Sequence, residues 1–322
     1  MDDIKTPLIS VVFTSYNHAT YLRQAVESIL NQTYKNFELI IVDDCSTDQS
    51  PSILRGYQQD PRVRLNLLEK NTGSYVKASN YGAKMAKGEF LLFAQCDDFA
   101  HPEQLERLLN AIEQKNEIGV AYSRSNMVDD KGTVFEDDFR GRERAFRKHC
   151  YMDTFIAGDL MRRFLSYSCV IPNLSAALIR RSLYEKVGGI SEKYLVAADW
   201  AFWLIISEYA NFYYISTPLN NFRQHATTIR NTIKMQKQIM EIYELMYEHL
   251  QKFSLMKSDM LNIKIGMGQV WFSYIFSGTS HWLKSFSAIY QESKKFEKNN
   301  ILFLFLGFLF YLKQLVYQRV RV

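Results

Sequence analysis

An acidic pair at the end of an apolar run is the feature of this sequence most able to do chemistry. Asp97 and Asp98 close the segment 95–98, which follows residues 90–94, a run typical of a buried strand. Two adjacent carboxylates there are costly to desolvate unless a positive charge compensates them. A divalent cation shared with nucleotide phosphates is a common compensator, so the pattern predicts a cation site. The alternative is that the pair only precedes a helix opened by Pro102, because acidic residues favour helix N-termini.

A second acidic pair, Asp43-Asp44, ends an apolar run at residues 37–42, and Thr14 ends another at 8–13. Strands predicted at these positions and at 63–68 and 90–94 alternate with predicted helices near 22–30, 51–57, 75–86 and 102–114. Such alternation predicts right-handed strand–helix–strand units and a parallel sheet, whose ligands bind at the carboxyl ends of the strands. We therefore expect Thr14 and both acidic pairs to converge on one crevice.

The composition excludes several other classes of protein. A net charge of +5 is mild, and the first half lacks a basic run interleaved with aromatic residues, so we expect no nucleic-acid partner. The four cysteines are scattered without a C-x-x-C pair, which gives no sign of a zinc site. Neither G-x-x-x-x-G-K-[ST] nor G-x-G-x-x-G occurs, which removes the motifs for P-loop and dinucleotide-binding proteins.

Beyond residue 225 the strand–helix alternation stops, and the sequence predicts a helical C-terminal region over 226–322. Residues 301–312 form an unbroken apolar run with lysines and arginines on both sides. This run is shorter than the about 20 residues that a membrane-spanning helix needs. Cationic flanks around an apolar, aromatic centre instead favour a segment, 301–317, that lies in the membrane interface. A core helix or an oligomer contact is the alternative.

The order and spacing of several short motifs resemble those of family 2 glycosyltransferases with a GT-A fold. Each motif is weak alone, but the series covers residues 7–225 after an N-terminal tail, 1–6. The matching segments are 10–17, 28–33, 38–48, Asn71-Thr72-Gly73 with Asn80, 87–89, the acidic pair followed by Pro102, 187–189, 198–204 and 222–225.

The resemblance implies an α/β GT-A domain, with a Rossmann-like, mostly parallel sheet flanked by helices and a helical C-terminal appendage. Residues 7–118 would form the nucleotide-sugar-binding half and residues 119–225 the acceptor-binding half. The implied enzyme inverts the anomeric centre, uses Mg²⁺ or Mn²⁺ and takes a nucleotide-sugar, usually UDP-linked. It would extend a glycan acceptor, lipid-linked in some cases, in the synthesis of O-antigen, capsule or exopolysaccharide. The cationic, apolar tail suggests a location at the cytoplasmic face of the inner membrane.

The resemblance also implies roles for residues that match the family's motifs. Asp97 would ligate the metal through the nucleotide diphosphate, and Asp98 would assist at the metal or at the donor sugar. His225 matches a histidine that reaches the diphosphate or metal in some relatives, with a purely structural role as the alternative. Asp199 matches the catalytic base, although an aspartate there can also cap the following helix.

The remaining matches concern the nucleotide and the sugars. Asp44 would accept a hydrogen bond from the imide of the base, which suits a carboxylate because it only accepts when ionised. The other implied contacts are Thr14, Tyr16 and Asp43 for the nucleoside, Gln95 and Trp200 for donor or acceptor sugar, and Arg223 for phosphate.

Two departures from the family pattern support a second hypothesis. Gln95 stands where the family usually has Asp, and Ala198 stands where it often has Glu. A catalytically degenerate protein that binds a nucleotide-sugar, or that acts as a scaffold in a polysaccharide assembly complex, would tolerate both changes. A third reading, nucleotidyl transfer to a sugar phosphate, lacks its usual glycine-rich N-terminal loop.

Overall fold

A computed structural model describes residues 6–142, 144–226, 228 and 235–252, together with short pieces between residues 260 and 312. The chain divides into two compact units, Met1–His225 and Ala226–Val322. The first unit contains a mixed sheet flanked by helices, so the α/β class expected from the sequence is confirmed.

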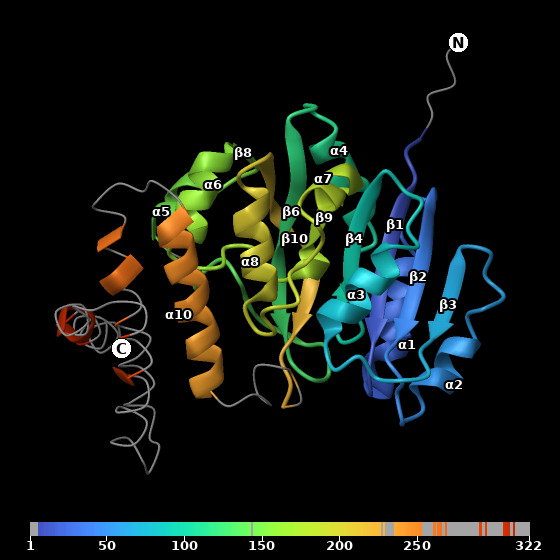
Figure 1. Cartoon of the computed structure of the whole chain (residues 1–322). Coiled ribbons are helices and arrows are strands. Elements are labelled where there is room, and N and C mark those ends of the chain that lie inside the picture. The colour runs from blue at the N-terminus through green and yellow to red at the C-terminus, as the bar shows by residue number, and fades with distance from the viewer. Residues whose placement is uncertain are drawn as a thin grey trace. The chain divides into compact units, whose positions relative to one another are not determined.

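The first half of the sheet is parallel, as the apolar runs predict. It consists of β1 (Ile9–Ser15), β2 (Phe37–Asp43), β3 (Val63–Leu67) and β4 (Phe90–Gln95), in the order β3-β2-β1-β4. Every residue of β1 is buried, which explains why its centre, residues 11–13, is apolar on both faces. The carboxyl ends of β1, β2 and β4 therefore lie at one edge of the sheet (Figure 1).

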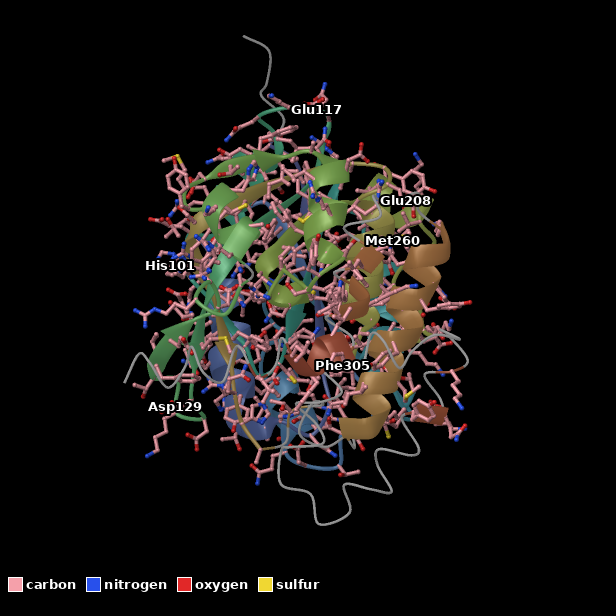
Figure 2. All side chains as sticks on the ribbon, turned by 90° about the vertical axis from the view of Figure 1, so that its left-hand side faces the viewer. His101, Glu117, Asp129, Glu208, Met260 and Phe305 are labelled. Atoms are coloured by element: carbon pink, nitrogen blue, oxygen red, sulfur yellow. The ribbon has the colours of Figure 1, made fainter. Side chains whose placement is uncertain are left out.

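The second half of the sheet mixes directions. β9 (Ala177–Arg180) runs antiparallel between β4 and β6 (Ile118–Val128), and β10 (Asn211–Arg223) runs parallel to β6. The short strands are β5 (Phe99–Ala100), β7 (Val134–Asp137) and β8 (Thr154–Ile156). Glu117 and Asp129, which flank β6, lie at opposite ends of the unit in Figure 2, and Asp129 marks the carboxyl end of that strand.

Helices cover both faces of the parallel half. Buried residues of α1 (Ala19–Leu30) and α4 (Gln104–Ile112) share one core with Val11 and Phe13 of β1. α3 (Tyr75–Ala83) places Ala78 against Ile40 on the opposite face. The remaining helices of the first unit are α2 (Ser50–Arg55), α5 (Arg144–His149), α6 (Gly158–Leu165), the 3-10 turn η1 (Leu174–Ala176), α7 (Arg181–Lys186) and α8 (Ala198–Ile206).

The second unit contributes one long described helix, α10 (Met235–Lys252). Across the part of the chain that the structure describes, no helix combines the length and the apolar character needed to cross a bilayer. Residues 301–317 lie outside the described residues apart from 305–309 and 312. The membrane-interface role of this segment therefore stays a prediction.

Candidate active site

A two-residue strand brings the acidic pair to the end of β10. β5 follows Asp98 directly and pairs antiparallel with β10, so that Phe99 lies opposite Asn221 and Ala100 opposite Asn220. This pairing places the segment that carries both acids beside the residues that end β10 and follow it.

Asp97 and His225 meet as a consequence. The His225 Nε2 lies 3.0 Å from the Asp97 Oδ2, with the Asp97 side chain 23% exposed and the His225 side chain 3% exposed. His18, just before α1, joins them, because one ligand atom from each of the three residues lies within 4.8 Å of the other two. Asp97 and His225 were predicted as site residues but His18 was not; its one signal in the sequence is its position directly after the matched segment 10–17.

These three side chains fit a divalent cation. One carboxylate and two imidazoles are donors that divalent first-row metals accept. The His18 Nε2 is also buried without a hydrogen-bond partner among the described residues. An unpartnered buried polar atom needs an explanation in a native fold, and a bound cation supplies one.

Asp98 faces the protein interior instead. Its Oδ2 accepts hydrogen bonds from the Asn173 Nδ2 at 2.5 Å and the Ser175 Oγ at 2.9 Å, and its Oδ1 accepts from the Arg223 backbone N–H at 3.1 Å. Burial, followed by the negative charge of Asp97, raises the pKa of Asp98 well above its usual range, and the N–H of Arg223 and the hydroxyl of Ser175 oppose this rise. Its contact with the metal or the donor sugar stays a prediction.

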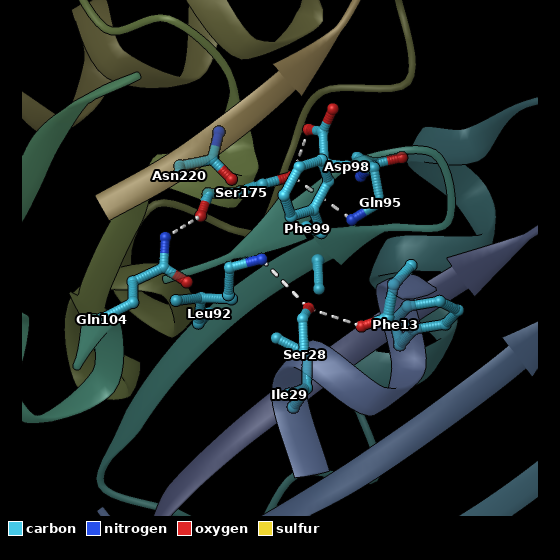
Figure 3. A pocket seen from close by; sticks show the side chains of 13 residues that line it. Phe13, Ser28, Ile29, Leu92, Gln95, Asp98, Phe99, Gln104, Ser175 and Asn220 are labelled. Atoms are coloured by element: carbon cyan, nitrogen blue, oxygen red, sulfur yellow. Dashed lines mark hydrogen bonds between the residues drawn. The ribbon is translucent and has the colours of Figure 1, made fainter. Parts of the chain in front are cut away.

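A small pocket lies behind Asp98 (Figure 3). Asp98, Ser175 and Asn220 lie together at one end of it, and Gln95 borders it. The Gln95 Oε1 accepts a hydrogen bond from the Thr14 Oγ1 at 3.2 Å, whereas the Gln95 Nε2 is buried without a partner among the described residues. The amide N–H that replaces the family's carboxylate is thus a donor without an acceptor, and its contact with a sugar stays a prediction.

Arg223 holds the backbone of the segment that carries Asp97. The residue is 1% exposed, and each of its three guanidinium nitrogens donates a hydrogen bond. The acceptors are the backbone carbonyls of Asp97, Asp129 and Asp130 and the Oε1 of Gln24 in α1. These bonds fix the backbone at Asp97, and a contact of the buried guanidinium with phosphate stays a prediction.

The two carboxylates at the end of β2 are held by the loop that follows β2 and by the loop that precedes α3. The Asp43 carboxylate accepts from the N–H and the hydroxyl of Ser46, at 2.9 and 2.7 Å. The Asp44 carboxylate accepts from the N–H and the hydroxyl of Thr72, at 2.7 and 2.8 Å. Each carboxylate oxygen can accept two hydrogen bonds, so capacity for a base imide is left at Asp44. Ser46 and Thr72 both lie in segments that match the family's motifs, but neither was predicted as a site residue.

The loops after β1 and β2 have strained backbone at two residues. Asn17 and Cys45 have φ angles of 51° and 62°, in the left-handed region that residues other than glycine rarely adopt. The Asn17 Oδ1 accepts from the Thr47 N–H at 2.8 Å, which links the two loops. Tyr16, which directly precedes Asn17, is 45% exposed and so is available to a ligand, as the nucleoside assignment requires.

Asp199 lies in the first turn of α8, which begins at Ala198, so the N-cap is Ala197 and the expectation that Asp199 caps the helix is wrong. Its Oδ1 accepts the Trp200 backbone N–H at 2.7 Å, and the Trp200 indole N–H donates to the Leu165 carbonyl at 2.7 Å. The carboxylate thus has a structural partner, and its role as the catalytic base stays a prediction. The indole N–H, in contrast, is already engaged within the protein.

Comparisons with known proteins agree with this architecture. The chain is 27% identical over 264 residues to an uncharacterized glycosyltransferase of Rickettsia typhi, covering 80% of this chain and 76% of that protein. It is 38% identical over 111 residues to TuaG of Bacillus subtilis, a putative teichuronic acid biosynthesis glycosyltransferase, covering 34% of this chain and 44% of that one.

A solved structure shares the fold. The complex of Staphylococcus aureus TarS 1-349 with UDP-GlcNAc superimposes with a TM-score of 0.66 at 19% identity, covering 88% of this chain and 81% of that one. The family model for glycosyl transferase family 2 matches residues 10–188, more than half of the 322 residues. The GT-A architecture and this match together show that the chain belongs to glycosyl transferase family 2.

Proposed function

We propose that the protein is an inverting glycosyltransferase that moves a sugar from a UDP-sugar to a hydroxyl group of a glycan acceptor. The observation that carries the proposal is the contact between Asp97 and His225 at the edge of the sheet where the parallel strands have their carboxyl ends. The loops that follow β1 and β2 lie at the same edge. Family membership supports sugar transfer, and the UDP-GlcNAc complex of TarS supports a UDP-linked donor. The name of TuaG supports a place in the synthesis of a bacterial surface polysaccharide such as capsule, exopolysaccharide or O-antigen.

In this proposal the nucleoside lies over the loops after β1 and β2. Thr14 and Tyr16 line its pocket, and Asp44 accepts the imide N–H of the base beside Asp43. Residues 7–118 form this donor half, and residues 119–225 form the acceptor half. Asp97 and His225 would hold a divalent cation, which would act as a Lewis acid on the departing diphosphate.

The proposed reaction is a single displacement. The oxygen of the acceptor hydroxyl attacks the anomeric carbon from the side opposite to the nucleoside diphosphate. Asp199 takes the hydroxyl proton as the new glycosidic bond forms and the bond to the diphosphate oxygen breaks. The anomeric configuration inverts, and UDP leaves with the electron pair of the broken bond.

We expect purified protein to bind UDP in the presence of Mn²⁺ and to consume a UDP-sugar. Calorimetry with UDP, with Mn²⁺ and then with excess EDTA, measures the first step. UDP release from UDP-GlcNAc, UDP-glucose and UDP-galactose, in the presence of candidate acceptor glycans, measures the second. Cation-dependent binding without any turnover would favour the degenerate binding or scaffold protein, and no UDP binding with either Mn²⁺ or Mg²⁺ would contradict both.

We further propose that residues 301–317 hold the enzyme at the cytoplasmic face of the inner membrane, near a lipid-linked acceptor. The cationic flanks and apolar centre of this segment support the proposal. Deleting residues from 300 onward should move the protein from the membrane pellet to the soluble fraction after cell lysis. A full-length protein that is already wholly soluble and monodisperse would instead indicate a core or oligomer helix.

A further inference from the structure

The orientation of the His18 ring is fixed by the backbone. Its Nδ1 lies 2.8 Å from the Tyr16 carbonyl oxygen. Because a carbonyl oxygen can only accept, Nδ1 must carry the proton, and in the neutral imidazole Nε2 then presents its lone pair. Metal-ligating histidines commonly donate their other ring N–H to a backbone carbonyl in this way, which fixes the tautomer and makes the free nitrogen a better donor.

Among the described residues, none forms a hydrogen bond with the lone pair of the His18 Nε2. The His18 Nε2 is buried and unpartnered, and a buried polar atom in that state costs free energy. The centroids of the His18 and His225 rings lie 5.3 Å apart and the ring planes are inclined at 75°, so the rings meet edge to face. Asp97 belongs to the same cluster. Packing against Tyr21, at 6.1 Å between ring centroids, explains the position of the ring but not the unsatisfied nitrogen.

We propose that His18 is a third protein ligand of the donor-site cation and that it makes the site prefer Mn²⁺ to Mg²⁺. The inference rests on the proposed function, because it requires a cation at Asp97 and His225. Imidazole nitrogen suits first-row transition metals, whereas Mg²⁺ takes oxygen ligands and gives up its water reluctantly. A second imidazole beside one carboxylate therefore favours Mn²⁺ over Mg²⁺.

The test is cation binding by the full-length protein, without turnover. Mn²⁺ alone is titrated and its free form followed by electron paramagnetic resonance, then displaced with Mg²⁺. His18→Ala should weaken Mn²⁺ binding by about 10- to 100-fold, a range that even outer-shell changes produce at metal sites. His18→Gln, which offers an oxygen in place of the nitrogen, should lower the preference for Mn²⁺ over Mg²⁺. His101→Ala removes an exposed histidine outside the cluster and should change neither value.

Nitrogen coordination is read directly from spin-echo modulation of bound Mn²⁺, which should show two imidazole nitrogens in the wild type and one in His18→Ala. Unchanged affinity and unchanged modulation in His18→Ala, with an unaltered melting temperature, would overturn the inference and leave the proposed function intact. No Mn²⁺ binding by the wild type, even with UDP, would overturn the inference and the cation site together. His18-dependent Mn²⁺ binding in a protein that consumes no nucleotide-sugar would support the inference and contradict the proposed function.

Discussion

Asp199→Asn should lower kcat for sugar transfer by about 10²- to 10⁴-fold while UDP binding is unchanged, because general bases contribute about that much. The amide keeps an oxygen that can accept the Trp200 N–H, as the Asp199 Oδ1 does at 2.7 Å. It cannot take a proton from an acceptor hydroxyl. The substitution therefore removes the chemistry and leaves the start of α8 in place, and steady-state kinetics with a UDP-sugar measure the difference.

A matched change at another helix separates this effect from helix stability. Asp159 occupies the first turn of α6, where its side chain is 92% exposed and pairs with Arg162. Asp159→Asn should leave kcat unchanged. If Asp199→Asn retains transfer within about threefold of the wild type, Asp199 serves the helix and the base must be sought elsewhere.

Asp97→Asn should abolish cation-dependent UDP binding, with a loss of affinity of about 100-fold or more in Mn²⁺. A neutral amide oxygen replaces the carboxylate that lies beside His225, and metal sites lose up to about 100-fold even when only an outer-shell partner is changed. Calorimetry of UDP with Mn²⁺ and with EDTA measures the effect. The melting temperature should change little, because the Asp97 side chain is partly exposed.

Asp98→Asn serves as the comparison for Asp97→Asn, because Asp98 is buried and hydrogen-bonded within the protein whereas the Asp97 side chain is partly exposed. Its two oxygens accept three hydrogen bonds, so an amide would turn an NH₂ group toward at least one donor. An unsatisfied buried group costs about 1–3 kcal/mol, so the variant should melt at a lower temperature. Mn²⁺-dependent UDP binding that survives in Asp97→Asn would show that the cation is held elsewhere.

The parallel half of the sheet was predictable because its strands are buried on both faces. β1, β2 and β4 appear in the sequence as short apolar runs, and the helices between them indicate that they run parallel. β9 was missed, since Ala177–Arg180 is only four residues long and runs directly into α7. β10 cannot be read from the sequence as one long strand, because Pro218 interrupts the pattern; a register shift on each side of Pro218 accommodates it.

The sequence predicts which segments form the candidate site, but it does not predict the directions in which their side chains point. Asp97 lies in the turn between β4 and β5, so the alternation of side chains along a strand does not predict which acid of the pair points inward. Which one does so depends on the pairing of β5 with β10, which brings the Arg223 N–H to Asp98, and on η1, which brings Ser175. His18 could not be predicted as a site residue, because Asp97 and His225 follow β4 and β10, far along the chain. No local pattern in the sequence links the three residues.

The placement of His225 has a consequence for synthesis of the protein. It is the last residue of the first unit and lies 128 positions after Asp97 in the sequence. Translation delivers the N-terminal strands first, and they can begin to pair before β10 leaves the ribosome. Until then the cation lacks one of its proposed ligands, so it stabilises the nascent donor half less by mass action. Cation binding would thus reach full strength only after β10 has joined the sheet, and chains halted before residue 225 would bind the metal more weakly than the whole chain.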